Sequence, residues 1–117
     1  MAWALQNQKQ FDPAVNVYGQ VVAGTAGEVA AKAQLQIGLC RLEQKRFAEA
    51  SVALLVVPFT YDYPEFNAAA LAEAARCAIE MKQKDQAEKL LQRVIKDHPG
   101  SKWADVAKER LEALKKS

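Results

Sequence analysis

Two segments decide the fold: residues 38–50 read GLCRLEQKRFAEA, and residues 75–87 read ARCAIEMKQKDQA. Each begins with a small residue, carries a cysteine two positions later and ends on an alanine twelve positions after its first residue. The two segments begin 37 residues apart, and a third alanine, Ala14, lies 36 residues before Ala50. A pattern that returns at an interval of about 20–50 residues indicates an array of structural repeats.

The repeated units are predicted to be helical. Half of the 117 residues are hydrophobic, and only five are glycine and four proline, which favours helix. Apolar residues recur at helical spacing in every segment, and no stretch reads as a sheet. Helices are predicted over residues 13–24, 29–44, 47–57, 68–81, 85–97 and 101–114, with breaks at 24–27, 45–46, 58–65, 82–84 and 98–100.

Helix ends are predicted from capping residues. Short polar side chains before an apolar run satisfy the free backbone N–H groups of a first turn, and a proline inside a run ends or distorts the helix. The pattern therefore assigns caps to Asp12, to the pairs Thr25–Glu28 and Asp85–Glu88, and to Ser101, and it assigns a helix end or a distortion to Pro58.

The chain resembles the tetratricopeptide repeat in the order of its features: a small residue, a turn between helices, a second small residue and then a proline. In that repeat, small residues such as Gly38 and Ala75 sit where two antiparallel helices cross. The resemblance implies an all-α, right-handed solenoid of antiparallel helix pairs with about seven helices. Its parts would be a truncated repeat (1–24), two repeats (27–64 and 65–99) and a capping helix (101–116).

The capping helix has a clear two-sided pattern. An apolar stripe is expected to face the array, with Trp103 at its edge, whereas the charged positions should face water. The inward residues are Val106, Ala107, Leu111 and Leu114, and the outward residues are Lys102, Asp105, Lys108, Glu109 and Glu112.

The resemblance also implies a function. An interval nearer 36–37 than 34 residues, together with Tyr63-Pro64 and residues 98–101 (His-Pro-Gly-Ser), is similar to the repeats of bacterial envelope proteins such as the Tol–Pal coordinator and the outer-membrane assembly lipoprotein D. Such proteins are non-catalytic adaptors, which implies a protein-protein interaction scaffold with another protein or peptide as partner. The alternative is self-association, a homodimer within a larger envelope assembly.

The binding residues follow from the repeat register, because the first helix of each pair lines a concave groove in such solenoids. The predicted groove consists of Lys32, Leu35, Gln36, Leu39, Leu42, Glu43, Ala69, Ala72, Glu73, Arg76 and Ile79. Its apolar strip and flanking charges favour a helical or extended apolar segment. Four aromatic residues between the repeats either wedge between helix pairs or anchor a partner: Phe59, Tyr61, Tyr63 and Phe66.

Other classes of function lack support in the sequence. A net charge of +2 is too even for a nucleic-acid binder, and no apolar run reaches the ~18 residues of a membrane span. Cys40 and Cys77 are too far apart in sequence for a zinc site, and as equivalent repeat positions they should lie too far apart to bridge. His98 is expected to belong to the turn at a helix end and to have no catalytic role. Residues 24–27 precede a helix, but they lack the preceding strand and the following Lys-Ser/Thr pair that a phosphate-binding loop needs. No enzyme, cofactor or metal is therefore expected.

The two halves of the chain differ in charge. Residues 1–60 hold five basic and four acidic groups, whereas residues 61–117 hold eleven and ten. The carboxylates of the second half, Glu73, Glu80, Glu88, Glu109 and Glu112, are predicted to lie on solvated faces. A solenoid end with few charges is usually covered by a neighbour. The low charge of the N-terminal half therefore favours two interpretations: the chain is a fragment of a longer protein, or it self-associates through its N-terminal end. The resemblance points to the periplasm or cell envelope, and the sequence leaves the cytoplasm open.

Overall fold

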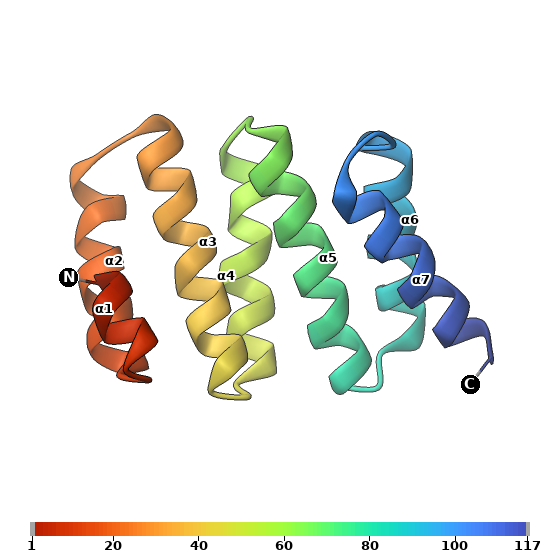
Figure 1. Cartoon of the computed structure of the whole chain (residues 1–117), viewed down its shortest axis with the longest axis horizontal. Coiled ribbons are helices and arrows are strands. Elements are labelled where there is room, and N and C mark those ends of the chain that lie inside the picture. Colours follow the sequence, from red (N-terminus) through yellow and green to blue (C-terminus); the bar gives the residue numbers. More distant parts are fainter. Residues whose placement is uncertain (1, 117) are drawn as a thin grey trace.

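The computed structural model describes residues 2–116, apart from the side chain of Asn7, and these residues form seven helices and no strand. The helices are α1 (Ala2–Asn7), α2 (Phe11–Gly24), α3 (Gly27–Glu43), α4 (Phe47–Thr60), α5 (Pro64–Glu80), α6 (Lys84–Asp97) and α7 (Lys102–Lys116). They follow one another along the long axis, with the two termini at opposite ends (Figure 1). Each helix packs on its neighbours in the chain, as in a helical solenoid. The predicted all-α solenoid is confirmed.

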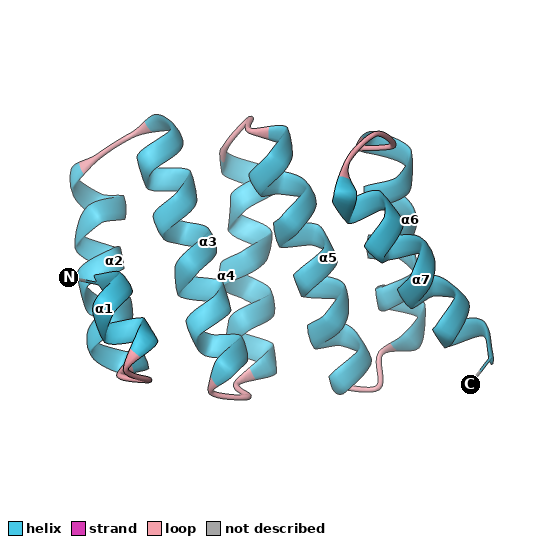
Figure 2. Cartoon of the chain, viewed as in Figure 1, coloured by secondary structure: helices cyan, strands magenta, loops and turns pink. Residues whose placement is uncertain are grey.

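Loops are short and alternate between the two edges of the array, so consecutive helices run in opposite directions (Figure 2). The five predicted breaks are present, although several are shifted by a residue or more. A sixth break, at residues 8–10, separates α1 from α2. The sequence does not predict this break, because the segment before Phe11 is too short to show helical periodicity.

The turns after α1, α3 and α5 share one geometry. Lys9, Lys45 and Lys82 each have a φ of 61°, in the left-handed region. At the middle turn, the Lys45 amide donates to the Leu42 carbonyl and the Arg46 amide to the Arg41 carbonyl, and the same two bonds recur at the other turns. This Schellman arrangement satisfies carbonyls that a helix end leaves unpaired. Its recurrence at intervals of 36 and 37 residues fixes the register of the repeats.

These turns explain why two predicted caps are wrong. After each left-handed lysine the chain enters the next helix two residues later, and therefore α2 begins at Phe11 and α6 at Lys84. Asp12 and Asp85 consequently lie inside the first turn of their helices and make no capping hydrogen bond.

At the opposite edge one predicted cap is wrong and one is confirmed. The residue before α3 is Ala26, and the Thr25 hydroxyl donates back to the Val21 carbonyl at 2.6 Å, so the expected Thr25–Glu28 box does not form. Ser101 accepts a hydrogen bond from the Ala104 amide at 3.2 Å, as predicted.

Pro58 does not end its helix, because α4 continues to Thr60. A proline within a helix removes one backbone hydrogen bond. Here the loss falls near the end of the helix, and the Tyr61 amide, three residues later, still donates to the Val57 carbonyl at 2.9 Å. The connector is therefore shorter than predicted, spanning residues 61–63.

The helix crossings hold the predicted small residues. A Cβ atom added to Gly38 would lie 2.5 Å from the Leu54 side chain, and Ala75 is fully buried at the equivalent position. Cys40 and Cys77 are buried and unpaired, as the register predicts. Close helix approach at these positions thus depends on the absence of a larger side chain.

Helix α7 covers the end of the array with the predicted face. Ala107 and Leu114 are buried, Val106 and Leu111 are half-buried, and the five charged positions listed above are exposed. One expectation is wrong: Glu73 is buried, because Arg110 of α7 lies over it. The Arg110 Nη2 atom donates to Glu73 Oε1 at 3.1 Å, and Nη1 donates to the Ala72 carbonyl at 2.8 Å.

Candidate protein-interaction face

The odd-numbered helices form one layer of the molecule, since α5 contacts both α3 and α7. We call the outer side of this layer the odd-helix face. All of the predicted groove residues lie on two helices of this layer, α3 and α5. Among them, Lys32, Glu43 and Arg76 are exposed, and Gln36, Leu39 and Ile79 are half-buried.

The other five predicted groove residues are not available on that face. They are buried: Leu35, Leu42, Ala69, Ala72 and Glu73. Helices α3 and α5 pack on their neighbouring even helices and also on each other, so a second stripe of their surface is covered. Apart from Glu73, these residues belong to the hydrophobic core. A partner on this face would therefore meet the remaining six.

Trp3 is the prominent side chain that sequence reasoning missed. It is 70% exposed, although tryptophan is seldom left open to water in a folded chain. The register provides the signal that could have found it, because Trp3 lies 36 residues before Leu39, which lies 37 before Arg76. The three residues are thus equivalent, and Leu39 and Arg76 were both assigned to the groove.

Two hollows flank Trp3 and Gln36. One has a volume of about 480 Å³ and is largely apolar, and we call it the N-terminal recess. It is lined by Ala2, Trp3, Val17, Tyr18, Val21, Val29, Lys32, Ala33 and Gln36. The other, of about 340 Å³, is more polar and is lined by Trp3, Gln6, Lys9, Phe11, Gln36 and Glu43. Three predicted groove residues, Lys32, Gln36 and Glu43, therefore border these hollows.

The four predicted aromatic residues lie in two different environments. Phe59 is 74% exposed on α4, and the Arg93 guanidinium of α6 lies 5.7 Å from its ring centroid. Tyr61, Tyr63 and Phe66 are half-buried. The Tyr63 and Phe66 rings are 6.2 Å apart, and the Tyr63 hydroxyl lies 3.0 Å from the position that a Cβ of Gly27 would take. Tyr63 thus joins the start of α5 to the start of α3.

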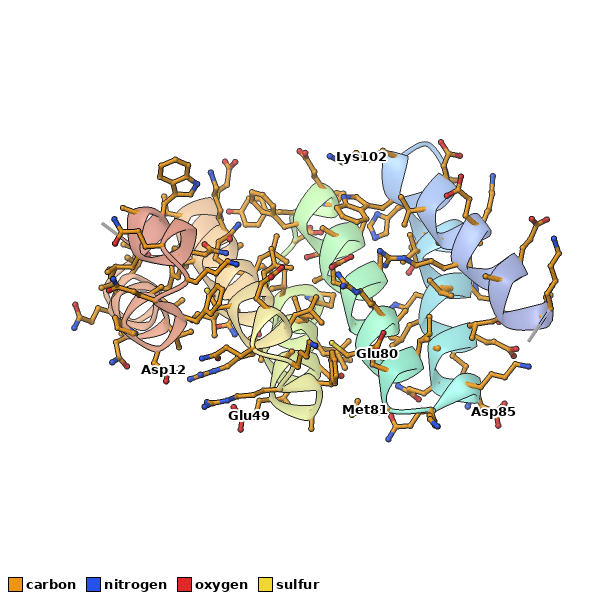
Figure 3. All side chains as sticks on the ribbon, turned by 60° about the horizontal axis from the view of Figure 1, so that its bottom comes forward. Asp12, Glu49, Glu80, Met81, Asp85 and Lys102 are labelled. Carbon is orange, nitrogen blue, oxygen red and sulfur yellow. The ribbon has the colours of Figure 1, made fainter. Side chains whose placement is uncertain are left out.

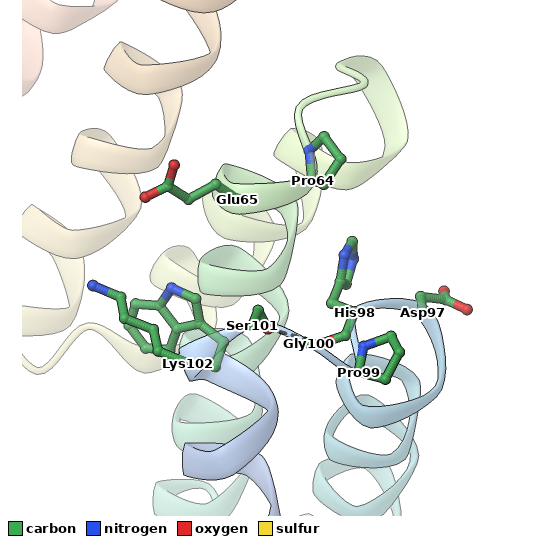
Figure 4. Close-up of a pocket in the computed structure, with 9 residues that line it drawn as sticks. Pro64, Glu65, Asp97, His98, Pro99, Gly100, Ser101 and Lys102 are labelled. Atoms are coloured by element: carbon green, nitrogen blue, oxygen red, sulfur yellow. Dashed lines mark hydrogen bonds between the residues drawn. The ribbon is translucent and has the colours of Figure 1, made fainter.

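A third hollow, of about 590 Å³, lies where α5 begins and α6 ends. Figure 4 shows Pro64 and Glu65 on one side of it and His98 with Pro99 on the other. The His98 carbonyl accepts a hydrogen bond from the Ser101 hydroxyl at 2.8 Å, which places His98 in the turn as expected. Within residues 2–116, no group of three or more His, Cys, Asp or Glu side chains could hold a metal ion.

A charged cluster joins the first two helix pairs at the edge of the left-handed turns. Asp12 and Glu49 both lie at this edge (Figure 3). Asp12 Oδ1 accepts hydrogen bonds from Arg41 Nη1 at 2.7 Å and Gln44 Nε2 at 3.1 Å, and Arg41 Nε lies 3.8 Å from Glu49 Oε2. The bond from Gln44, followed by that from Arg41, lowers the pKa of Asp12 below its ordinary value of 3.8. Arg41 thus links α3 to α2.

The thiols of Cys40 and Cys77 have low reactivity. Burial raises the pKa of Cys40 and of Cys77 from the ordinary value of 9.0 to about 11. A thiol reacts as its thiolate, and both side chains are therefore inert near neutral pH.

Residues 61–111 match the family model described as tetratricopeptide repeat. The matched tetratricopeptide-repeat segment contains α5, α6 and most of α7. It supports a tetratricopeptide-repeat family, whose members generally serve as non-catalytic protein-interaction modules. No curated protein matches the chain. No helix within residues 2–116 is both long and apolar enough for a membrane span.

Proposed function

We propose that this chain is a non-catalytic interaction scaffold of a bacterial tetratricopeptide-repeat protein, and that it holds a peptide or partner helix on the odd-helix face. The main observation in support of this proposal is the exposed indole of Trp3. Tryptophan is enriched among the residues that dominate binding energy, especially beside pockets. Trp3 stands between two hollows on the face where the register places a groove.

The remaining surface of the face specifies the kind of segment that would bind. Leu39 and Ile79 offer half-buried apolar surface, and Lys32, Glu43 and Arg76 offer charges of both signs. This mixture favours a partner segment that is apolar with charged flanks. Such a segment would bind through its own side chains. It does not provide the cluster of cations that would capture a terminal carboxylate.

A peptide selection tests this assignment. A random peptide library displayed on phage would be selected against the chain, and a selected peptide would be titrated into the 15N-labelled protein. We expect amide shifts on α1, α3 and α5, and Trp3→Ala should weaken binding about tenfold. Val52→Ala is the matched control, since Val52 is 69% exposed on the even helix α4. Shifts confined to α4 and α6 would contradict the proposal.

Self-association remains the second candidate, because the exposed Trp3 and Val29 form an apolar patch at one end of the array. Sedimentation velocity over a hundredfold range of concentration decides between the two. A dimer that dissociates on Trp3→Ala supports self-association, whereas a monomer throughout excludes it. The envelope location belongs to the proposal and is supported by the sequence resemblance alone; cell fractionation tests it.

A further inference from the structure

The outer side of α4, the central even helix, is apolar over about three turns. The residues on this side recur at spacings of three and four, so they lie on one side of the helix. We call them the α4 stripe: Ala48, Val52, Leu55, Val56 and Phe59. Val52 and Phe59 are largely exposed, whereas Leu55 and Val56 are half-buried. The outer side of a surface helix is ordinarily polar, and this one therefore requires an explanation.

The fold does not require these positions to be apolar. The register of the left-handed turns gives Val52, Val56 and Phe59 equivalents in both neighbouring even helices. These equivalents are exposed and either polar or small: Asn16, Gln20 and Ala23 in α2, and Lys89, Arg93 and Lys96 in α6. The other repeats thus pack without large apolar side chains there. Clustered exposed apolar side chains of this kind mark an interaction site.

The position of α4 in the array keeps its outer side open. Along the long axis, α4 lies between α2 and α6 (Figure 1). A repeat added at either end would extend a solenoid along this axis. The α4 stripe would therefore stay exposed in a longer array, and its cover has to come from outside the solenoid.

A row of cations lies beside the α4 stripe. We call the exposed Lys89, Arg93 and Lys96 of α6 the basic row. The Arg93 guanidinium is 5.7 Å from the Phe59 ring centroid, and Ser51 of α4 lines a hollow of about 580 Å³ together with Lys89. The row thus borders the stripe at both ends. Within residues 2–116, Lys89 and Lys96 form no ion pair, so both are free to meet a carboxylate.

We propose that the α4 stripe and the basic row bind an amphipathic segment of a partner protein, with its apolar side on α4 and acidic residues along α6. Charge complementarity selects this partner, because the row that borders the stripe consists of cations alone. From Ala48 to Phe59 the stripe extends about 16 Å, which matches three turns of a partner helix. The inference goes beyond the proposed function, since it assigns a second surface, on the even helices.

Two other occupants match the charges less well. An anionic lipid surface would meet cations on only one side of the stripe, because the α2 side offers the neutral Asn16 and Gln20. A second copy would bring few free carboxylates to the basic row. The only acidic residues of its α2 and α4, Asp12 and Glu49, already lie beside Arg41.

The test uses two synthetic peptides of about 14 residues, each long enough to cover the stripe as a helix. Both carry leucine at the helical spacing i, i+3, i+4 and i+7; the remaining positions are glutamate in the acidic peptide and lysine in the control peptide. Each is titrated to millimolar concentration into the 15N-labelled protein at low salt, where charges are least screened. We expect saturable amide shifts in α4 and α6 with the acidic peptide. The control peptide should bind at least about tenfold more weakly.

A pair of aromatic variants tests the α4 stripe. Phe59→Ala should weaken binding of the acidic peptide about tenfold. Because Phe59 is 74% exposed, the fold should persist, and circular dichroism checks this. Trp3→Ala is the matched control, since it removes a similarly exposed aromatic side chain from another part of the molecule, and it should leave the binding unchanged.

A pair of charge variants tests the basic row. Lys89→Glu combined with Lys96→Glu should reverse the preference, so that the lysine peptide binds more tightly than the acidic one. Lys32→Glu combined with Lys108→Glu changes the net charge equally on the odd helices α3 and α7. This second variant should still prefer the acidic peptide.

Three results of the titrations would overturn the proposal: no saturable shift in α4 and α6, equal affinity for the two peptides, or an unchanged preference after charge reversal at Lys89 and Lys96. Cosedimentation with vesicles of phosphatidylserine and phosphatidylcholine, abolished by Phe59→Ala, would also overturn it, because a lipid surface would then be the occupant. A concentration-dependent dimer that Phe59→Ala dissociates would do the same in favour of a second copy. The proposed function is tested through Trp3 and the odd helices, so either proposal can fail without the other.

Discussion

Arg110 in α7 and Glu73 in α5 attach the capping helix to the neighbouring odd helix. Their ion pair, at 3.1 Å, is accompanied by the 2.8 Å bond from Arg110 to the Ala72 carbonyl. The Glu73 side chain is 11% exposed, and Arg76 lies 3.8 Å from its other oxygen. Arg110 therefore satisfies two acceptors that α7 itself removes from water.

Arg110→Ala should destabilise the protein by about 1–3 kcal/mol, because it leaves a carbonyl and a mostly buried carboxylate without a strong donor. Urea denaturation measures the loss. The control is Asp97→Ala, which breaks an exposed pair with Arg93 within one helix, leaves Arg93 beside Phe59 and should cost less than about 0.5 kcal/mol. Equal losses for the two variants would show that the bonds of Arg110 add nothing beyond a surface pair.

Gly38→Ala should destabilise the protein by about 1–3 kcal/mol, since the new methyl group would overlap the Leu54 side chain and force α3 away from α4. Gly19→Ala provides the opposite case in a helix. Nothing lies within 4 Å of its added Cβ, so the substitution should stabilise α2 by about 0.5–1 kcal/mol. Thermal melts compare the two, and a stable Gly38→Ala variant would contradict the crossing at this residue.

Lys82→Gly should stabilise the protein by up to about 1 kcal/mol, because glycine adopts the left-handed conformation of this turn without strain. Lys82→Val should do the reverse, since a branched side chain is poorly tolerated at positive φ. Lys89→Gly, inside α6, serves as the control and should cost about 1 kcal/mol. Chemical denaturation should rank glycine above lysine, and lysine above valine, at residue 82.

The two cysteines predict a loss of stability at high pH. In the unfolded chain the thiols ionise near pH 9.0, whereas burial holds them protonated to about pH 11 in the folded chain. The unfolded state therefore binds fewer protons between these values, and the free energy of unfolding falls as pH rises from 9 to 11.

Denaturation of the wild type and of a variant with Cys40→Ala and Cys77→Ala, at pH 8 and pH 10, measures that fall. The variant should lose less stability between the two pH values. A thiol reagent at pH 8 provides the second readout. Rapid labelling of both native thiols would contradict their burial.

The repeat register could be predicted because it depends on residues that act locally in the same way each time. Gly38 and Ala75 have no side chain to obstruct a crossing, and Ala107 and Leu114 fall on one side of an amphipathic helix. Helix starts were less predictable. Asp12 and Asp85 look like caps, but the left-handed lysine before each helix sets the start, and a lysine gives no sign of positive φ in the sequence.

The candidate site was less predictable than the fold for a related reason. Sequence register can place Leu35 or Ala72 on an odd helix, but burial depends on how closely the next odd helix approaches. Glu73 shows this most clearly, because an acidic residue beside Arg76 reads as a solvated position. Its burial requires Arg110, 37 residues further along, whose position only the packing of α7 reveals.

The two ends of the array have unequal protection, and this has a consequence for its motions. Each helix contacts only near neighbours, so the chain can open stepwise from an end without disrupting the whole. The C-terminal end is held by Arg110 and the buried face of α7, whereas at the other end Tyr18 and Val21 are only partly buried. Amide hydrogen exchange should therefore be fastest in α1 and α2 and slowest in α4 and α5. Opening would begin beside Trp3, the side chain best placed to meet a partner.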